Sequence, residues 1–239
     1  MRINPKNPKT LAGDQVIGEM RKQTDTVLLA FSTGKDAVGA WLACRPHFAR
    51  IVPYYMYLVP GLEFVERSLQ YYEKAFGQRI LRVPHPSLYR WLNNGIFVGP
   101  DQIETIVQAN LPSFEYLDMQ DEIRRDAGLS PDCYTASGVR AADSPLRRIS
   151  IVTHGAISHK KQQFMPIWDW KIDQLLGEIR SAGMLLSVDY RMFGRSFDGL
   201  DYRFTEPIKR HFPRDYAKIC EWFPLVEAEI KRREFSHAH

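Results

Sequence analysis

The sequence contains 239 residues, of which 44% are hydrophobic and 25% are charged, values that are ordinary for a soluble globular protein. No run approaches the roughly 18 apolar residues that a membrane-spanning helix requires. The formal net charge of +4 suits an anionic ligand, but it is too small and too scattered to indicate nucleic acid. We therefore expect one large soluble domain without a membrane partner.

The three cysteines, Cys44, Cys133 and Cys220, lie far apart and form no Cys-x-x-Cys pair. Zinc sites and iron–sulfur clusters commonly depend on such pairs, so we expect neither of these cofactors. A sparse, odd number of cysteines is typical of a reducing compartment. The first residues also lack the apolar segment of a leader peptide, and we expect a cytoplasmic protein.

The first third of the chain alternates between strand-like and helix-like segments. Residues 1–10 are expected to form a loose arm, followed by a short amphipathic helix over 11–22. Strands are predicted over 26–31, 50–58 and 79–84, with helices over 36–46 and 63–76 between them. This order predicts a parallel sheet with right-handed crossovers.

The later segments are less regular. Residues 84–112 predict an irregular, partly helical insertion, and 116–128 a helix. Strands near 132–137 and 163–165, a helix over 169–182 and a closing helix over 214–234, bent near Pro224, complete the chain. We expect an α/β fold: a Rossmann-like parallel sheet flanked by helices, with an irregular helical C-terminal part. Residues 1–239 would form a single domain, with its core over 24–180 and a helical extension over 181–239.

The segment Ser32-Thr33-Gly34-Lys35-Asp36 connects the first predicted strand to the first predicted helix of the sheet. A strand that turns into a helix directs backbone N–H groups and the positive helix end toward the turn, where phosphate can bind. Gly34 permits close approach of a ligand, and Lys35 adds a charge. Asp36 could orient Lys35 or hold Mg²⁺. An ordinary connection with a surface Lys-Asp pair remains the alternative.

A second polar segment begins at Gly138 and contains Arg140, Ser144 and Arg147. On a helix, a spacing of seven brings the two arginines to one face, where guanidinium groups could bind phosphate or sulfate in bidentate fashion. Taken alone, a solvated helix explains this pattern as well. Farther along, Lys160 is a further candidate phosphate contact in a basic loop.

These segments together resemble the PAPS (phosphoadenosine phosphosulfate) reductase-like family of the adenine nucleotide alpha-hydrolase, or N-type ATP pyrophosphatase, superfamily. The loop is similar to the Ser-Gly-Gly-x-Asp-Ser motif, with Thr33 in place of Gly and Ala37 in place of Ser. Three further segments are similar to family motifs in the same order: residues 60–64, Gly138 to Arg147, and residues 166–170. The resemblance therefore covers residues 26–176.

The resemblance implies that ATP or an adenine sulfonucleotide is the substrate, with Mg²⁺ as the accompanying ion. Phosphates would be bound by Ser32, Thr33, Gly34, Lys35, Gly138, Arg140, Ser144, Arg147 and Lys160. Lys35, Asp36, Arg140 and Arg147 would carry catalysis, with Asp36 also as the Mg²⁺ ligand. The implied reaction is attack at the α-phosphorus with release of pyrophosphate, which adenylylates an unidentified acceptor.

Three other functions remain open. A sulfonucleotide reductase would need a reactive cysteine near the C-terminus, but Cys220 lies in a helix-like context typical of a structural thiol. A sulfate adenylyltransferase small-subunit-like protein would need a protein partner. The altered loop residues Thr33 and Ala37 would also suit a non-catalytic nucleotide-binding or interaction module. A homo-oligomer is compatible with each of these functions.

Overall fold

The computed structural model describes residues 11–237. The loose arm expected over residues 1–10 lies outside this range. Across the described residues, none of the helices combines the length and the apolar character needed to cross a bilayer.

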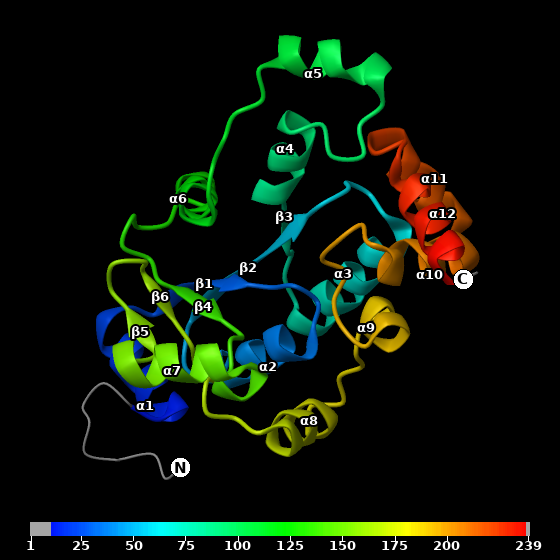
Figure 1. Cartoon of the computed structure of the whole chain (residues 1–239). Coiled ribbons are helices and arrows are strands. Elements are labelled where there is room, and N and C mark those ends of the chain that lie inside the picture. The colour runs from blue at the N-terminus through cyan, green and yellow to red at the C-terminus, as the bar shows by residue number, and fades with distance from the viewer. Residues whose placement is uncertain (1–10, 238–239) are drawn as a thin grey trace. The chain divides into compact units, whose positions relative to one another are not determined.

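The fold is built on a six-stranded, mostly parallel sheet with helices on its flanks (Figure 1), as predicted. The strand order is β3-β2-β1-β4-β6-β5. β1 pairs in parallel with β2 and with β4, β4 pairs in parallel with β6, and β5 runs antiparallel to β6. The strands are β1 (Thr26–Ala30), β2 (Arg50–Tyr57), β3 (Leu81–Pro84), β4 (Thr135–Ser137), β5 (Ile157–Ser158) and β6 (Gln163–Phe164).

The strand order reverses at β1. From β1 the chain proceeds to β2 and β3 on one side, whereas β4, β6 and β5 lie on the other side. Leu28 pairs with Thr135 and Ala30 with Ser137, so β1 and β4 end at the same level. In open α/β sheets, ligands bind outside the carboxyl ends of the strands at such a switch point. A ligand-binding site is therefore expected at the carboxyl ends of β1 and β4.

The helices follow the predicted pattern in the first third of the chain and depart from it later. They are α1 (Gly13–Gln23), α2 (Lys35–Cys44), α3 (Glu63–Phe76), α4 (Pro86–Asn93), α5 (Ile103–Ala109), α6 (Tyr116–Asp126), α7 (Pro145–His154), α8 (Ile172–Ser181), α9 (Val188–Phe193), α10 (Tyr202–His211), α11 (Pro213–Trp222) and α12 (Val226–His237).

Two helical predictions need correction. Arg140 does not share a helix with Arg147, because Arg140 has an extended backbone and α7 begins only at Pro145. In place of the single closing helix, the structure has two helices, α11 and α12, and the break between them lies around Pro224. Proline cannot donate the backbone hydrogen bond that a continuous helix would need there.

The contacts between residues divide the chain into two compact units. The first contains the chain up to Tyr55, Ala75–Leu81 and Asp121–Leu186; the second contains Met56–Lys74, Arg82–Gln120 and the chain from Ser187 onward. In the first unit, the apolar run of β1 is buried at Val27, Leu28 and Leu29, as expected for a strand covered on both faces. A Cβ on Gly39 of α2 would lie 2.3 Å from Leu175 of α8, so Gly39 allows these helices to pack closely.

The second unit has an aromatic core around Phe64, the second residue of α3. The Phe64 ring packs against those of Phe197 and Phe212, with ring centroids 5.6 and 5.2 Å away. The buried Asp215 carboxylate accepts hydrogen bonds from the backbone N–H groups of Glu63 at 2.6 Å and Phe64 at 3.1 Å. A carboxylate here satisfies N–H groups that an α-helix leaves unpaired and complements the helix dipole.

We expect Asp215→Ala to lower the free energy of unfolding by about 2 kcal/mol, because two buried N–H groups would lose their acceptor. Urea unfolding followed by circular dichroism measures this loss. Asp126→Ala is the matched control, since Asp126 is exposed in the last turn of α6 and should change stability by less than about 0.5 kcal/mol. Equal effects of the two substitutions would contradict the capping role.

Candidate functional site

The loop Ser32–Gly34 joins the end of β1 to the start of α2 at the switch point of the sheet. Gly34 is the N-cap of α2, with an extended backbone, and as a glycine it has no side chain with which to cap the helix. The first turn of an α-helix directs N–H groups and a partial positive charge outward. The loop and the start of α2 therefore have the geometry of an anion-binding turn, and phosphate binding there stays a prediction.

Thr33 adopts a backbone conformation that glycine would adopt more easily. Its φ is +61°, in the left-handed region, and the residue is buried. Its Oγ1 donates a hydrogen bond to the carbonyl oxygen of Ser32 at 2.6 Å. A β-branched residue in this region is uncommon and strained. The substitution of Thr for the family's Gly therefore alters a position that does require positive φ.

Asp36 organises the cations around the loop. Its Oδ2 accepts a hydrogen bond from Nζ of Lys35 at 2.7 Å, and its Oδ1 accepts one from Nε of Arg140 at 2.6 Å. Both carboxylate oxygens are thus engaged by cationic side chains. Within residues 11–237, no group of three or more His, Cys, Asp or Glu side chains is placed to hold a metal ion.

Arg140 lies just after β4 and is only 4% exposed. Besides binding Asp36, it donates to the Trp170 carbonyl oxygen at 3.2 Å and to Oδ1 of Asp143 at 2.9 Å. The guanidinium thus bridges three segments, with hydrogen bonds made through Nε, Nη1 and Nη2. This geometry makes Arg140 a residue that fixes the start of α2 relative to the segment after β4.

Asp143 links Arg140 to Arg147. Its Oδ2 accepts a hydrogen bond from Nη1 of Arg147 at 2.9 Å, and Arg147 is about half exposed. Ser144 lies between them as the N-cap of α7, with Oγ accepting from the Arg147 backbone N–H at 3.2 Å. Three cations and two carboxylates therefore alternate from Lys35 to Arg147 and leave one net positive charge. The sequence analysis gave Asp143 no role in the site, although its spacing of four from Arg147 indicates a helical ion pair.

Gly138 allows the end of β4 to approach α2. A Cβ at this position would lie 2.6 Å from the carbonyl carbon and oxygen of Asp36 and 2.9 Å from the Ala37 nitrogen. These are backbone atoms, which cannot move aside as a flexible side chain can. The role of Gly138 is therefore steric, and it explains why a glycine precedes the arginines.

The segment Pro166–Trp170, which follows β6, reaches the same site through its backbone. The carbonyl oxygen of Trp168 accepts from the Ala141 N–H at 2.7 Å, and that of Trp170 accepts from Arg140. Three of the four motifs that carried the family resemblance are thus brought together in the first unit. The fourth, residues 60–64, belongs to the second unit.

Lys160 lies away from these residues, contrary to our expectation. It precedes β6, and Gln163 of β6 pairs in parallel with Thr135, the first residue of β4. The neighbouring His159 contacts Tyr134, which also precedes β4, at 2.6 Å. Lys160 is therefore at the amino end of the parallel strands, whereas the loop and Gly138 lie at their carboxyl ends.

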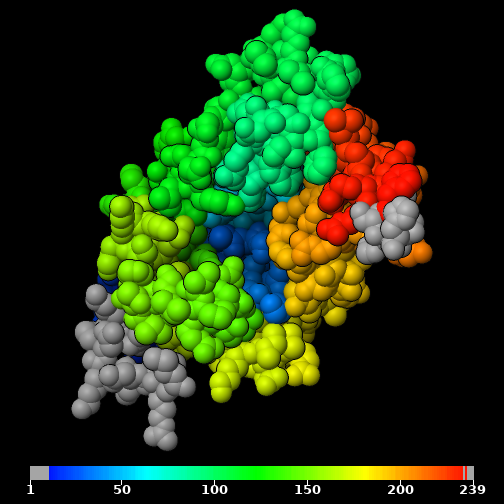
Figure 2. All heavy atoms as spheres, in the orientation of Figure 1, coloured from blue at the N-terminus to red at the C-terminus, as the bar shows by residue number. Residues whose placement is uncertain are grey.

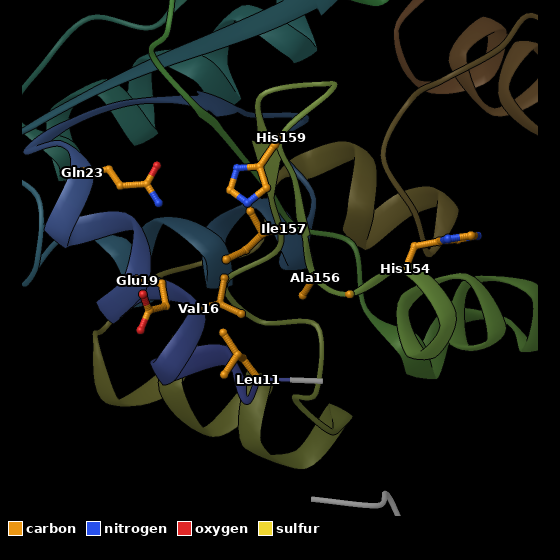
Figure 3. Close-up of a pocket in the computed structure, with 9 residues that line it drawn as sticks. Leu11, Val16, Glu19, Gln23, His154, Ala156, Ile157 and His159 are labelled. Carbon is orange, nitrogen blue, oxygen red and sulfur yellow. The ribbon is translucent and has the colours of Figure 1, made fainter. Parts of the chain in front are cut away.

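A separate cavity of about 370 Å³ lies in the first unit between α1 and the segment around β5 (Figure 3). Glu19 and Gln23 of α1 line it from one side, and Ile157 and His159 from the other. None of the predicted phosphate-binding residues lines this cavity. The cavity is therefore distinct from the loop site.

Cys220 lies on α11 in the second unit and is half-buried. Burial raises the pKa of its thiol above the ordinary value, with the nearby Glu227 carboxylate adding to the effect and Tyr216 and Lys209 opposing it. Burial also raises the pKa of the Cys133 thiol. A raised pKa disfavours the thiolate, which is the nucleophilic form. These environments are those of structural cysteines.

No protein-family model matches the chain, and no curated protein matches it. Among solved structures, U34-tRNA thiolase NcsA from Methanococcus maripaludis, with its [4Fe-4S] cluster, has a TM-score of 0.46 and 10% identity over 90% of this chain and 80% of its own. NH3-dependent NAD synthetase from Campylobacter jejuni subsp. jejuni NCTC 11168, in complex with the nitrate ion, has a TM-score of 0.44 and 9% identity. The match covers 94% of this chain and 96% of the synthetase chain. Neither comparison shows the PAPS reductase-like family. At these scores the likeness carries no argument about function.

One cofactor expectation is corrected by these comparisons. We expected no iron–sulfur cluster, because the sequence lacks paired cysteines. The NcsA structure holds a [4Fe-4S] cluster. This finding overturns our expectation that an iron–sulfur cluster is absent.

We expect Gly138→Ala to lower the free energy of unfolding by about 1–3 kcal/mol, because the added methyl group would overlap the backbone at Asp36. Urea unfolding of the purified variant measures the loss. Gly177→Ala in α8 is the control, because no atom lies within 4 Å of the added Cβ. In this control variant the free energy of unfolding should rise by about 0.5–1 kcal/mol, because alanine has a higher helix propensity than glycine.

We expect Thr33→Gly to keep or raise stability by up to about 1 kcal/mol. Relief of the left-handed strain, about 1–2 kcal/mol, is partly offset by the greater freedom of glycine in the unfolded chain. Ser150 is exposed in the middle of α7, and Ser150→Gly should lower the free energy of unfolding by a few tenths of a kcal/mol. A loss above about 1 kcal/mol for Thr33→Gly in thermal unfolding would show that the conformation at Thr33 is not strained.

Proposed function

We propose that this chain is a nucleotide-binding enzyme of the ATP pyrophosphatase type, which binds the phosphates of an adenine nucleotide at the Ser32–Lys35 loop. One observation carries the proposal. The glycine-capped start of α2, Lys35 and the Asp36–Arg140 pair come together where the sheet order reverses at β1. A phosphate bound there would meet helix N–H groups and a lysine charge at once.

Each charged residue has a distinct role in this proposal. Lys35 contacts phosphate oxygens, and Arg147, which is half exposed, moves from Asp143 toward the developing charge on the leaving group. Arg140 is buried and acts as a positioning residue, as does Asp36, whose oxygens orient both Lys35 and Arg140. The single net positive charge of the set favours an anionic ligand.

The proposed reaction is nucleophilic attack by an acceptor on the α-phosphorus of ATP. The bond from the α-phosphorus to the bridging oxygen breaks, pyrophosphate leaves with that electron pair, and the acceptor is adenylylated. Positioning and charge stabilisation supply most of the catalysis in phosphoryl-type transfer. No nucleophilic side chain is then needed, which agrees with the raised thiol pKa values of Cys133 and Cys220.

Isothermal titration with ATP tests the proposal. We expect saturable binding by the wild-type chain and a loss of affinity of about tenfold or more in Lys35→Ala, because one charge-assisted contact is removed. Lys160→Ala is the matched control, since Lys160 lies at the amino end of the strands and its loss should leave affinity unchanged. Equal losses in the two variants, or no binding of ATP, would overturn the proposal.

The same titration with adenosine 3′,5′-bisphosphate distinguishes the other nucleotide functions. Tighter binding of the bisphosphate than of ATP would indicate a sulfonucleotide enzyme in place of an ATP pyrophosphatase. A non-catalytic module would bind ATP but release no pyrophosphate with any acceptor. Measuring pyrophosphate release by the wild type and by Asp36→Asn, in a panel of acceptors, separates that outcome from an enzyme.

A further inference from the structure

The residues of α7 are among the yellow-green spheres of Figure 2, and the outer face of this helix carries exposed apolar side chains. Leu146, Ile149 and Val152 lie one helical turn apart, and the first two are 79% and 62% exposed. Ile151, on the opposite side of the helix, is buried. An amphipathic surface helix normally directs such a stripe to the core. This stripe faces outward, as expected of a surface that another protein covers.

The α7 stripe is bordered by positive charge. Arg148 lies beside Val152, four residues away on the helix, and is exposed. Within residues 11–237, Arg148 makes no ion pair, in contrast to Arg147, which binds Asp143. The outer face of α7 is thus apolar with a basic edge.

The short helix α5 has the opposite character. None of its residues is buried, and Ile103 and Val107, one turn apart, are 49% and 72% exposed. Glu104 lies next to this apolar pair, and Asp101 precedes the helix; both are exposed. A helix of two turns is marginal in water without packing. α5 contacts α4 of the same unit, but its outer face stays exposed and is apolar with an acidic edge.

We propose that α5 of one copy of this chain docks on α7 of a second copy. The two faces match in size, both being apolar stripes of two to three residues, and their edges carry opposite charges. Glu104 and Asp101 would face Arg148, and Ile103 and Val107 would pack against Ile149 and Val152. Charge complementarity of this kind sets orientation and partner choice.

The contact joins two different surfaces. If the contact is made twice between the same two copies, α5 to α7 and α7 to α5, the pair is a closed, isologous dimer; if it is made once and repeated, it remains heterologous and forms a ring or an open chain of copies. In either case the assembly depends on both helices. This inference is independent of the nucleotide proposal, since none of its residues belongs to the Ser32–Lys35 loop.

Sedimentation velocity over a micromolar concentration series tests the assembly. We expect the wild-type chain to associate with increasing concentration, whereas Ile103→Asp on α5 and Ile149→Asp on α7 should each remain monomeric. Mixing these two variants should restore association, because the first retains an intact α7 and the second an intact α5. Circular dichroism confirms that each variant is folded.

Charge reversal provides a second readout. Glu104→Arg and Arg148→Glu should each weaken association by about tenfold or more, and combining them in one chain should restore it. Glu178→Arg and Arg180→Glu, both on the exposed side of α8, are the matched controls and should leave association unchanged.

Three results would overturn the inference. The first is a wild-type chain that is monomeric at every concentration. The outer face of α7 would then bind some other protein and not a second copy of this chain. The second is an oligomer that survives Ile149→Asp. The third is failure of the mixed variants to associate, which would indicate a contact between identical surfaces.

Discussion

The partly buried ion pair between Arg140 and Asp36 holds the candidate site together. Arg140 follows β4 and Asp36 begins α2, so the pair joins the two elements on either side of the switch point. The Arg140 side chain is buried, whereas that of Asp36 is 28% exposed, and Arg140 also pairs with Asp143. The pair also orients Lys35 through Asp36, and it connects to Arg147 through Asp143. The positions of all these charges depend on one guanidinium group.

The sequence predicted the sheet and the loop well, because these features depend on local signals. The apolar run before Ser32 predicts a strand, and the apolar residues that follow Asp36 predict a helix. β1 and α2 begin and end close to where they were expected. The parallel order of the first three strands followed from their alternation with helices. Such patterns reflect short-range geometry, which a single sequence contains.

Other features depend on tertiary packing and were not predicted. The placement of Lys160 is decided by the direction of β6 relative to β4, and β6 has only two residues. Arg140 is extended whereas Arg147 lies in α7, because α7 begins only at Pro145 and is capped by Ser144. The positive φ of Thr33 also could not be read from the sequence, because propensity alone argues against it.

The conformation of Thr33 has a consequence for how the loop responds to an anion. A buried threonine in the left-handed region keeps that shape only because the surrounding chain imposes it. The loop is thus shaped by folding before any ligand arrives, and binding need not order it. Pre-organisation of this kind reduces the conformational entropy that a ligand must overcome. Such a loop would also exclude ligands that require a different backbone, so in the proposed nucleotide site the strain at one threonine would act on selectivity as well as on affinity.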